Sequence, residues 1–245
     1  MQPSLIVPLM YCFTDCTLNQ SNPCSPAEEM CREVVVDIVF VLDGSRSVLV
    51  HNFEKVKDFV NVLIRGFHVG PNMTHVGVVQ YSSRVQNEVV LGTLHSKEAL
   101  RDAVQSIKHL SEGTVTGAAI RFMTNVAFRN ARPGVPRLAL VLTDGRSADD
   151  VTAPAKAAHG QGITMFAIGV TDNVDEDELK IIATDPDSIH LYHVDDFDLL
   201  QKLQLQQINN KLMILNLKIY ILYILLSLAI CGFAIRGPRV FIAGV

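Results

Sequence analysis

The sequence predicts an α/β fold: a doubly wound, mostly parallel six-stranded sheet with one antiparallel edge strand and helices on both faces. Two nearly continuous apolar, β-branched runs, residues 34–42 and 137–143, are typical of strands that are buried on both faces of a parallel sheet. Segments with apolar residues at helical spacing alternate with the strand-like segments, as in folds built from strand-helix-strand units. Only three residues join the strand-like segments 74–81 and 85–91, which is typical of an antiparallel hairpin.

Local patterns justify each element in turn. Apolar residues recur at steps of three and four between Phe53 and Phe67, which predicts an amphipathic helix that ends near Gly66. Asp175 and Glu178 have the spacing of a capping box, which predicts a helix over residues 176–184. The other expected elements, in chain order, are helices around residues 99–107, 119–127 and 150–159, strands over 163–170 and 190–194, and a helix over 197–203.

Composition divides the chain into three segments. With 245 residues, 49% of them hydrophobic and 19% charged, the chain suits a folded protein with one sizeable core. We expect a cysteine-containing leader over residues 1–32, an α/β domain over 33–204 and an apolar tail over 205–245. The tail has four bases and no acid, which leaves 17 bases against 25 acids, a balance of −8, in the rest of the chain. This acidic balance argues against a nucleic-acid partner.

The two terminal segments leave alternatives open. Cys12, Cys16, Cys24 and Cys31 favour disulfides of undetermined pairing over a zinc site, because none of them has Cys-x-x-Cys spacing. Residues 5–13 are apolar but contain a proline and follow no base, so they form a poor secretory signal. Residues 212–235 are long and apolar enough for a transmembrane helix. This segment is either a single-span anchor or translated non-coding sequence.

Carboxylates and hydroxyls follow two of the buried strands directly. Asp43, Ser45 and Ser47 come after the first strand, and Asp144 follows the strand over residues 137–143. In open α/β sheets, ligands bind beyond the carboxyl ends of the central strands, so both groups are expected in one crevice. Oxygen ligands suit Mg²⁺, or alternatively Mn²⁺ or Ca²⁺, whereas zinc and copper prefer nitrogen or sulfur. Since Mg²⁺ usually keeps several waters, a carboxylate from another molecule can take an open position.

These residues closely resemble the metal-ion-dependent adhesion site of von Willebrand factor type A domains. The matching set is Asp43-x-Ser45-x-Ser47, Thr114 within the Gly-Thr-Val-Thr-Gly run at 113–117, and Asp144. The resemblance covers about residues 33–204, and within that family the motifs are most similar to those of the matrilins, followed by collagens with A domains. It implies that Ser45, Ser47 and Thr114 ligate Mg²⁺ through their hydroxyls. Asp43 and Asp144 would balance its charge, and an Asp or Glu of a protein partner would complete the coordination.

The resemblance predicts an extracellular adhesion or matrix-assembly module, not an enzyme. Its partner would be a matrix or cell-surface protein, and the chain would be secreted, or held at the cell surface if the tail spans a membrane. One alternative is a Mg²⁺-dependent phosphohydrolase with Asp43 as nucleophile, although a second acid two residues later is replaced by Ser45. Another is a structural A domain whose metal is incidental. Phosphate-binding loops, nucleophile elbows and zinc-protease motifs are absent from the sequence.

Two further features complete the expectations. Asn72 begins an Asn-Met-Thr sequon in an expected loop, which makes it a candidate for N-glycosylation in a secreted protein. Arg46 and Arg146 flank the metal-site residues, and a secondary hypothesis is that they hold an acidic ligand, since arginine binds carboxylates bidentately. Solvated loop arginines are the alternative interpretation.

Overall fold

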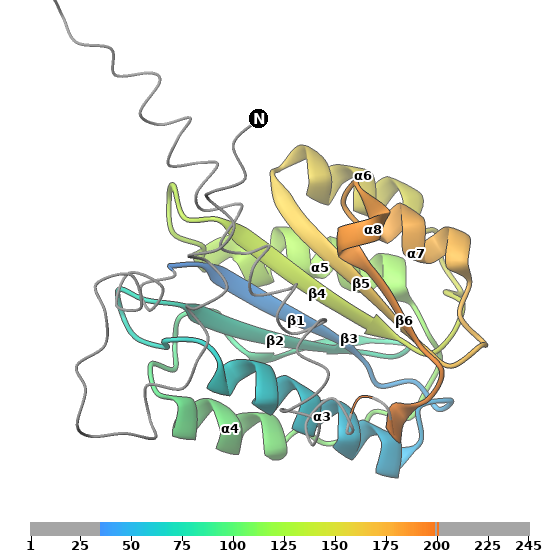
Figure 1. Cartoon of the computed structure of the whole chain (residues 1–245), viewed down its shortest axis with the longest axis horizontal. Coiled ribbons are helices and arrows are strands. Elements are labelled where there is room, and N and C mark those ends of the chain that lie inside the picture. The colour runs from blue at the N-terminus through green and yellow to red at the C-terminus, as the bar shows by residue number, and fades with distance from the viewer. Residues whose placement is uncertain (1–34, 199, 201–245) are drawn as a thin grey trace, which may run out of the picture. The chain divides into compact units, whose positions relative to one another are not determined.

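A six-stranded sheet forms the centre of the fold (Figure 1). The computed structural model describes residues 35–198 and 200, and its strands lie in the order β3-β2-β1-β4-β5-β6. All neighbouring strands are parallel except β2 and β3, which pair in opposite directions. The strands are β1 (Asp37–Asp43), β2 (His75–Tyr81), β3 (Val85–Val89), β4 (Arg137–Thr143), β5 (Ile163–Val170) and β6 (Leu191–Val194). The predicted doubly wound sheet with one antiparallel edge strand is therefore confirmed.

Helices cover both faces of the sheet, as predicted. Figure 1 shows α3 and α4 together on one face, and α5, α6 and α7 on the other. The helices are α3 (Val50–Arg65), α4 (Lys97–Gln105), α5 (Thr116–Asn125), α6 (Thr152–Gly160), α7 (Glu176–Ile182) and α8 (Asp187–His190), with a 3-10 turn η2 (Ala127–Asn130). This two-sided cover explains why the central strands are continuously apolar.

The central strand β1 shows how the two faces share the core. All seven of its residues are buried. Successive side chains of a strand point to opposite faces of the sheet. Val39 and Val41 belong to the apolar cluster that includes Ile120 of α5 and Ala155 of α6, so the intervening Phe40 and Leu42 face the layer on the other side.

Several elements begin or end at other residues than the sequence pattern predicts. In one case a tertiary contact explains the difference, because a residue of the expected helix forms hydrogen bonds with a strand instead. The helix expected over residues 176–184 ends at Ile182. Thr184 instead pairs with Met165 of β5: its N–H donates to the Met165 carbonyl at 3.0 Å, and its hydroxyl accepts from the Met165 N–H at 2.9 Å. His190 belongs to α8 rather than to the last strand. The first strand begins at Asp37, three residues later than expected, and β3 ends at Val89.

Several predictions fall wholly or partly outside the described residues. The cysteine-containing leader, the apolar tail and the candidate span over 212–235 lie there, as do residues 199 and 201–203 of the helix predicted over 197–203. Within residues 35–198 and 200, no helix is both long and apolar enough to cross a membrane. The domain boundaries at 33 and 204 remain predictions. The sequon asparagine, Asn72, is exposed in a turn.

Candidate metal-ion site

The two aspartate loops leave the sheet side by side. Strands β1 and β4 are parallel neighbours, with Leu42 opposite Leu142 in the register. Asp43 is therefore the last residue of β1, and Asp144 follows the last residue of β4, at the same edge of the sheet. This edge is where the connections from β1 and β4 turn toward opposite faces, which is the usual place of a ligand site in open α/β sheets.

A chain of hydrogen bonds joins four of the five predicted site residues. The Ser47 hydroxyl donates to Asp144 Oδ1 at 2.8 Å. The Ser45 and Ser47 hydroxyl oxygens lie 2.9 Å apart. Since a serine hydroxyl has one hydrogen and Ser47 gives its own to Asp144, Ser45 is the donor of the pair. The Ser45 N–H in turn donates to Asp43 Oδ1 at 2.9 Å. The structure thus gathers Asp43, Ser45, Ser47 and Asp144 into one oxygen-rich cluster.

The loop that contains Thr114 is bound to both aspartate loops through the main chain. On one side, the Ser111 N–H donates to the Gly44 carbonyl and the Arg46 N–H donates to the Glu112 carbonyl, each at 2.8 Å. On the other side, the Ala148 N–H donates to the Thr114 carbonyl at 2.8 Å. The main chain of the loop that contains Thr114 therefore lies between the two aspartate loops. The role of its hydroxyl as a metal ligand stays a prediction.

Two buried hydroxyl groups behind the cluster hold Asp43 in place. Asp43 Oδ2 accepts from the Thr143 hydroxyl at 2.8 Å and from the Tyr81 hydroxyl at 3.4 Å. The Tyr81 oxygen in turn accepts from the Thr116 hydroxyl at 3.2 Å. Sequence analysis missed Tyr81, although a signal existed: it is the last residue of β2 and lies directly opposite Asp43 in the register of β1 with β2.

The electrostatics of the site favour the binding of a cation. Asp43 is 3% exposed and Asp144 is 4% exposed. Burial raises the pKa of Asp43, and burial, with a further contribution from the Asp43 charge, raises the pKa of Asp144 to about 6. Among the described residues, no group of three or more His, Cys, Asp or Glu side chains could hold a metal ion. The oxygen atoms that the structure brings close to the two carboxylates here are the hydroxyls of Ser45 and Ser47.

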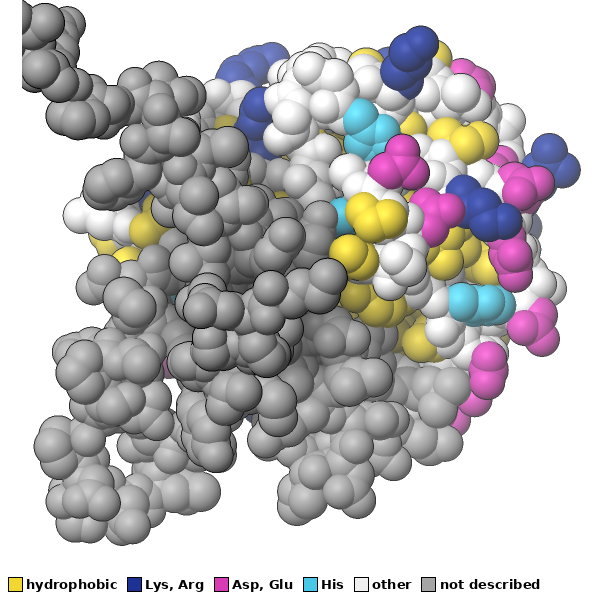
Figure 2. Space-filling model, turned by 45° about the horizontal axis from the view of Figure 1, so that its top comes forward, with side chains coloured by type: hydrophobic (Ala, Val, Ile, Leu, Met, Phe, Trp, Pro, Cys, Tyr) yellow, Lys and Arg dark blue, Asp and Glu magenta, His cyan; other side chains and the backbone are white. Residues whose placement is uncertain are grey.

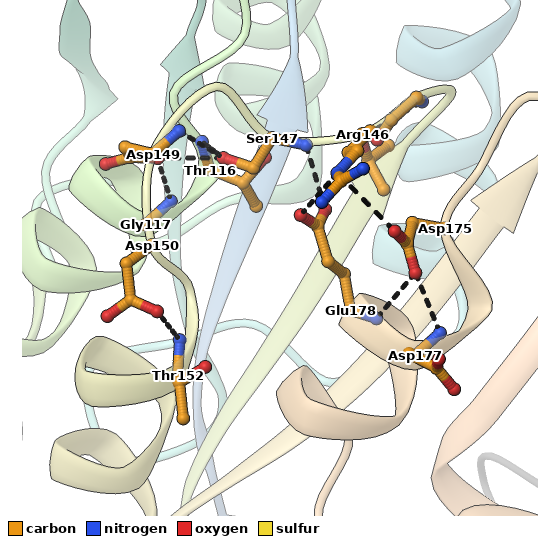
Figure 3. Close-up of polar contacts among 12 residues, drawn as sticks. Thr116, Gly117, Arg146, Ser147, Asp149, Asp150, Thr152, Asp175, Asp177 and Glu178 are labelled. Carbon is orange, nitrogen blue, oxygen red and sulfur yellow. Dashed lines mark hydrogen bonds and ion pairs between the residues drawn. The ribbon is translucent and has the colours of Figure 1, made fainter.

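In the loop after Asp144, the side chain of Arg146 lies close to two acids of the same chain (Figure 3). Arg146 Nε lies 3.5 Å from Asp175 Oδ2 and 3.7 Å from Glu178 Oε1, at the start of α7. The Ser147 N–H donates to Glu178 Oε2 at 2.8 Å. Asp175 caps α7 as predicted, accepting from the N–H groups of Asp177 and Glu178. In a capping box the second acid bonds back to the main chain of the cap residue, whereas Glu178 accepts from Ser147 and so orders the loop after Asp144.

The same loop is fastened to the start of α5 on its other side, as Figure 3 also shows. The Ser147 hydroxyl accepts from the Thr116 N–H at 3.0 Å and donates to Asp149 Oδ1 at 2.8 Å. Asp149 Oδ1 also accepts from the Gly117 N–H at 2.8 Å. The loop that presents Asp144 is therefore held from two sides, by α5 and by α7.

The surface around this end of the sheet is acidic. Figure 2 shows Asp and Glu side chains gathered toward the right of the visible face, with Lys and Arg among them. That is the side at which the carboxyl ends of the strands lie in Figure 1. Exposed acids of this kind repel other negative charges at this end of the molecule.

Comparison with protein families and curated proteins finds clear relatives. The family model for the von Willebrand factor type A domain matches residues 37–206. Matrilin-1 of Gallus gallus is 42% identical over 165 residues, covering 66% of this chain and 33% of that protein. Human matrilin-4 is 42% identical over 182 residues, which is 72% of this chain and 29% of the relative. The human collagen alpha-1(XXI) chain is 42% identical over 174 residues, or 71% and 18%. The chain thus spans a third or less of these relatives.

Solved structures share the fold. The proximal thread matrix protein 1 of the mussel byssus superposes with a TM-score of 0.66 at 26% sequence identity, over 74% of this chain and 47% of that one. A second structure of the same protein is described as having a zinc-occupied MIDAS motif; it has a TM-score of 0.65 at 25% identity, with 70% and 46% coverage. These matches agree with the six-stranded sheet and its flanking helices.

Proposed function

Because the chain belongs to the von Willebrand factor type A domain family, we propose that residues 33–204 form an extracellular adhesion or matrix-assembly module. In this proposal the module holds Mg²⁺ through Asp43, Ser45, Ser47, Thr114 and Asp144, and the metal binds an acidic side chain of a protein partner. Mn²⁺ or Ca²⁺ can take the same all-oxygen site. The association makes and breaks no covalent bond, so the module is not an enzyme.

The observation that carries the proposal is the hydrogen-bonded contact between Ser47 and Asp144, which are 97 residues apart in the sequence. It brings a carboxylate from the β4 loop within reach of two serine hydroxyls from the β1 loop. A hard divalent cation prefers such a set of carboxylate and hydroxyl oxygens. The zinc-occupied motif described for the mussel thread protein supports a divalent ion at the corresponding place in this fold.

The surroundings of Asp43 support a binding role over a nucleophilic one. Its carboxylate is buried and already accepts from the Ser45 N–H and from the hydroxyls of Thr143 and Tyr81. A nucleophile must present a free oxygen to its substrate, whereas a residue that orients ligands benefits from such fixed contacts. We therefore assign Asp43 to charge balance and to positioning Ser45.

The names of the relatives and the exposure of the sequon support an extracellular location for the protein. Similarity to matrilins and to a collagen chain supports a place in the extracellular matrix or at the cell surface. The partner is then a matrix or cell-surface protein with an exposed Asp or Glu. The exposed turn at Asn72 supports glycosylation of its side chain during secretion. Membrane attachment through the apolar tail remains part of the proposal.

Calorimetric titration of the EDTA-treated full chain with MgCl₂ tests the metal site. We expect saturable binding that is lost in Asp43→Ala and in Asp144→Asn. Asp177→Ala is the matched control, because it removes an acid with a 90% exposed side chain on nearby α7 and should leave Mg²⁺ binding unchanged. Absence of binding by the wild type, or equal binding by Asp43→Ala, would contradict the proposal.

Two further measurements separate the alternatives. Adhesion of the full chain to decellularised matrix should require Mg²⁺ and fail in EDTA or in Asp43→Ala. Adhesion that persists in EDTA would favour a structural module in which the metal is incidental. Hydrolysis of p-nitrophenyl phosphate in Mg²⁺ should be absent. Turnover that disappears in Asp43→Asn would favour the phosphohydrolase.

A further inference from the structure

An exposed apolar pair, Leu49 and Val50, follows the serines of the loop after β1. The exposed fraction is 50% for Leu49 and 63% for Val50. Among the described residues, the only other exposed large apolar side chains are Val90 at 38% and Ile181 at 37%. Single exposed apolar residues are common on protein surfaces and need no explanation. The two most exposed ones, however, are neighbours, and the first comes two residues after Ser47.

The backbone of Leu49 has a conformation that disfavours leucine. Its φ is 58° and its ψ is 152°. Residues with a Cβ atom rarely adopt a positive φ, and this combination of angles belongs almost exclusively to glycine. Such strained conformations persist where the surrounding structure imposes them, and they cluster at functional sites. A leucine at this position therefore lowers the stability of the fold relative to glycine.

Leu49 is also an unfavourable cap for the helix that follows it. It is the N-cap of α3, and its side chain forms no hydrogen bond with the helix. Serine, threonine, aspartate, asparagine and glycine are preferred at this place, whereas leucine is strongly disfavoured. Glycine would satisfy both the cap and the backbone angles. Since Leu49 breaks two local rules without a gain from burial, its side chain is a candidate for a functional contact.

The main chain on both sides of Leu49 is fixed. The Leu49 N–H donates to the Arg46 carbonyl at 3.3 Å, and the Leu49 carbonyl accepts from the Phe53 N–H at 3.0 Å. Val48 and Phe53 are both buried and occupy the two positions of a hydrophobic staple, directly before the cap and in the first turn of the helix. The core therefore uses Val48 and leaves Leu49 at the surface. A backbone that is already ordered needs little further ordering when a partner covers the side chain.

The pair lies within reach of a partner that is bound at the metal-ion site. Consecutive Cα atoms are 3.8 Å apart, so the Cα atom of Leu49 is at most about 7.6 Å from that of Ser47. Two residues of an extended peptide span about 7 Å. The acids that gather at this end of the molecule in Figure 2 repel negative charge. An apolar contact adds affinity that these acids do not oppose.

We propose that Leu49 and Val50 form an apolar contact beside the metal ion and select partners with a large apolar side chain about two residues from the acidic one. This inference rests on the proposed metal-dependent function and adds a second determinant to it. The metal ion attracts the carboxylate of the partner. The apolar pair then distinguishes among acidic sequences, because it gains free energy only where the partner buries it.

Binding of the full chain to three immobilised peptides tests this inference separately from the metal-dependent function. The first is Gly-Leu-Gly-Asp-Gly-Leu-Gly; the second has serine in place of both leucines, and the third has asparagine in place of the aspartate. In Mg²⁺ we expect the leucine peptide to bind about five-fold or more tightly than the serine peptide. Equal affinity for these two, or no binding of either, overturns the inference about the pair. Undiminished binding of the asparagine peptide, or of the leucine peptide in EDTA, contradicts the metal-dependent function as well.

Variants of the pair assign the peptide preference to these side chains. Leu49→Gly suits the backbone angles and the cap, so we expect an unchanged or higher thermal midpoint and unchanged Mg²⁺ affinity, together with loss of the preference for the leucine peptide. Val50→Thr keeps the shape of the side chain but makes it polar, and should reduce the preference. Val90→Thr is the matched control, because it makes the same change at an exposed valine directly after β3, and should leave the preference unchanged. A wild-type preference in both Leu49→Gly and Val50→Thr overturns the inference.

Discussion

Asp144, a proposed metal-site residue, carries a buried charge that is unfavourable for the fold. Its carboxylate is buried beside that of Asp43, and the Ser47 hydroxyl is its side-chain donor. Burial and the neighbouring negative charge favour the protonated form, which is why the pKa of Asp144 is raised from 3.8 to about 6. If this part of the structure served only to stabilise the fold, the buried carboxylate of Asp144 would be expected to pair with a basic side chain. The arrangement is consistent with selection for cation binding.

The raised pKa of Asp144 predicts an unusual pH dependence for the metal-free chain. A carboxyl whose pKa is higher in the folded than in the unfolded state binds more protons when folded, so its stabilising effect is complete below pH 3.8 and is lost as the pH rises through about 6. In EDTA, the thermal midpoint of the wild type relative to Asp144→Asn should therefore rise between pH values of about 7 and 5.

The comparison with Asp144→Asn is necessary because other groups titrate in the same range. The pKa of His190 is lowered by burial, which opposes the trend, and that of Glu178 is raised by burial, which adds to it. Both contributions are common to the two proteins and cancel in the difference. A difference in midpoint that stays constant across this pH range would show that the Asp144 carboxyl does not titrate as predicted.

The strands were predictable from sequence because their burial is two-sided and leaves a simple pattern. Both β4 and β5 have the predicted bounds. Element ends were less predictable, since long-range contacts such as that of Thr184 with Met165 decide them. The gathering of Asp43 with Asp144 followed from the parallel order of the sheet. The part played by Glu178 did not, because a side chain able to cap its own helix also lies within reach of the Ser147 N–H.

The contact between α5 and the β4 loop predicts a specific effect of Gly117. A Cβ atom at this position would collide with the main-chain carbonyl of Asp150. Gly117→Ala should push the loop that holds Asp144 away from α5, because a backbone atom cannot rotate aside as a side chain can. We expect a loss of about 1–3 kcal/mol in the free energy of unfolding and at least ten-fold weaker Mg²⁺ binding by calorimetry.

Gly145→Ala is the matched control for this element. It adds the same methyl group to the loop itself, next to Asp144, where no atom lies within 4 Å of the added Cβ. Its Mg²⁺ affinity should stay close to that of the wild type. If the two alanine variants bind Mg²⁺ equally well, the position of the loop against α5 does not matter for the site.

At the scale of the molecule, the proposed metal-ion site joins three loops that the fold brings together from distant parts of the chain. Each loop is hydrogen-bonded to the next, and each begins or ends at a strand of the central sheet or at a helix that packs on it. The two buried carboxylates, Asp43 and Asp144, repel each other at that edge. A divalent ion that neutralises them acts on the whole folded state, because the unfolded chain has no such site.

Thermal unfolding of the full chain should therefore depend on Mg²⁺. A ligand that binds only the folded state stabilises it by RT ln(1 + [L]/Kd), which is about 2.7 kcal/mol when its concentration is 100 times the dissociation constant. For a domain of this size, that corresponds to a rise of roughly 5–10 °C in the midpoint. Differential scanning calorimetry in EDTA and in saturating MgCl₂ measures it. Asp43→Ala should show no rise, and an equal rise in this variant would place the stabilising ion at another site.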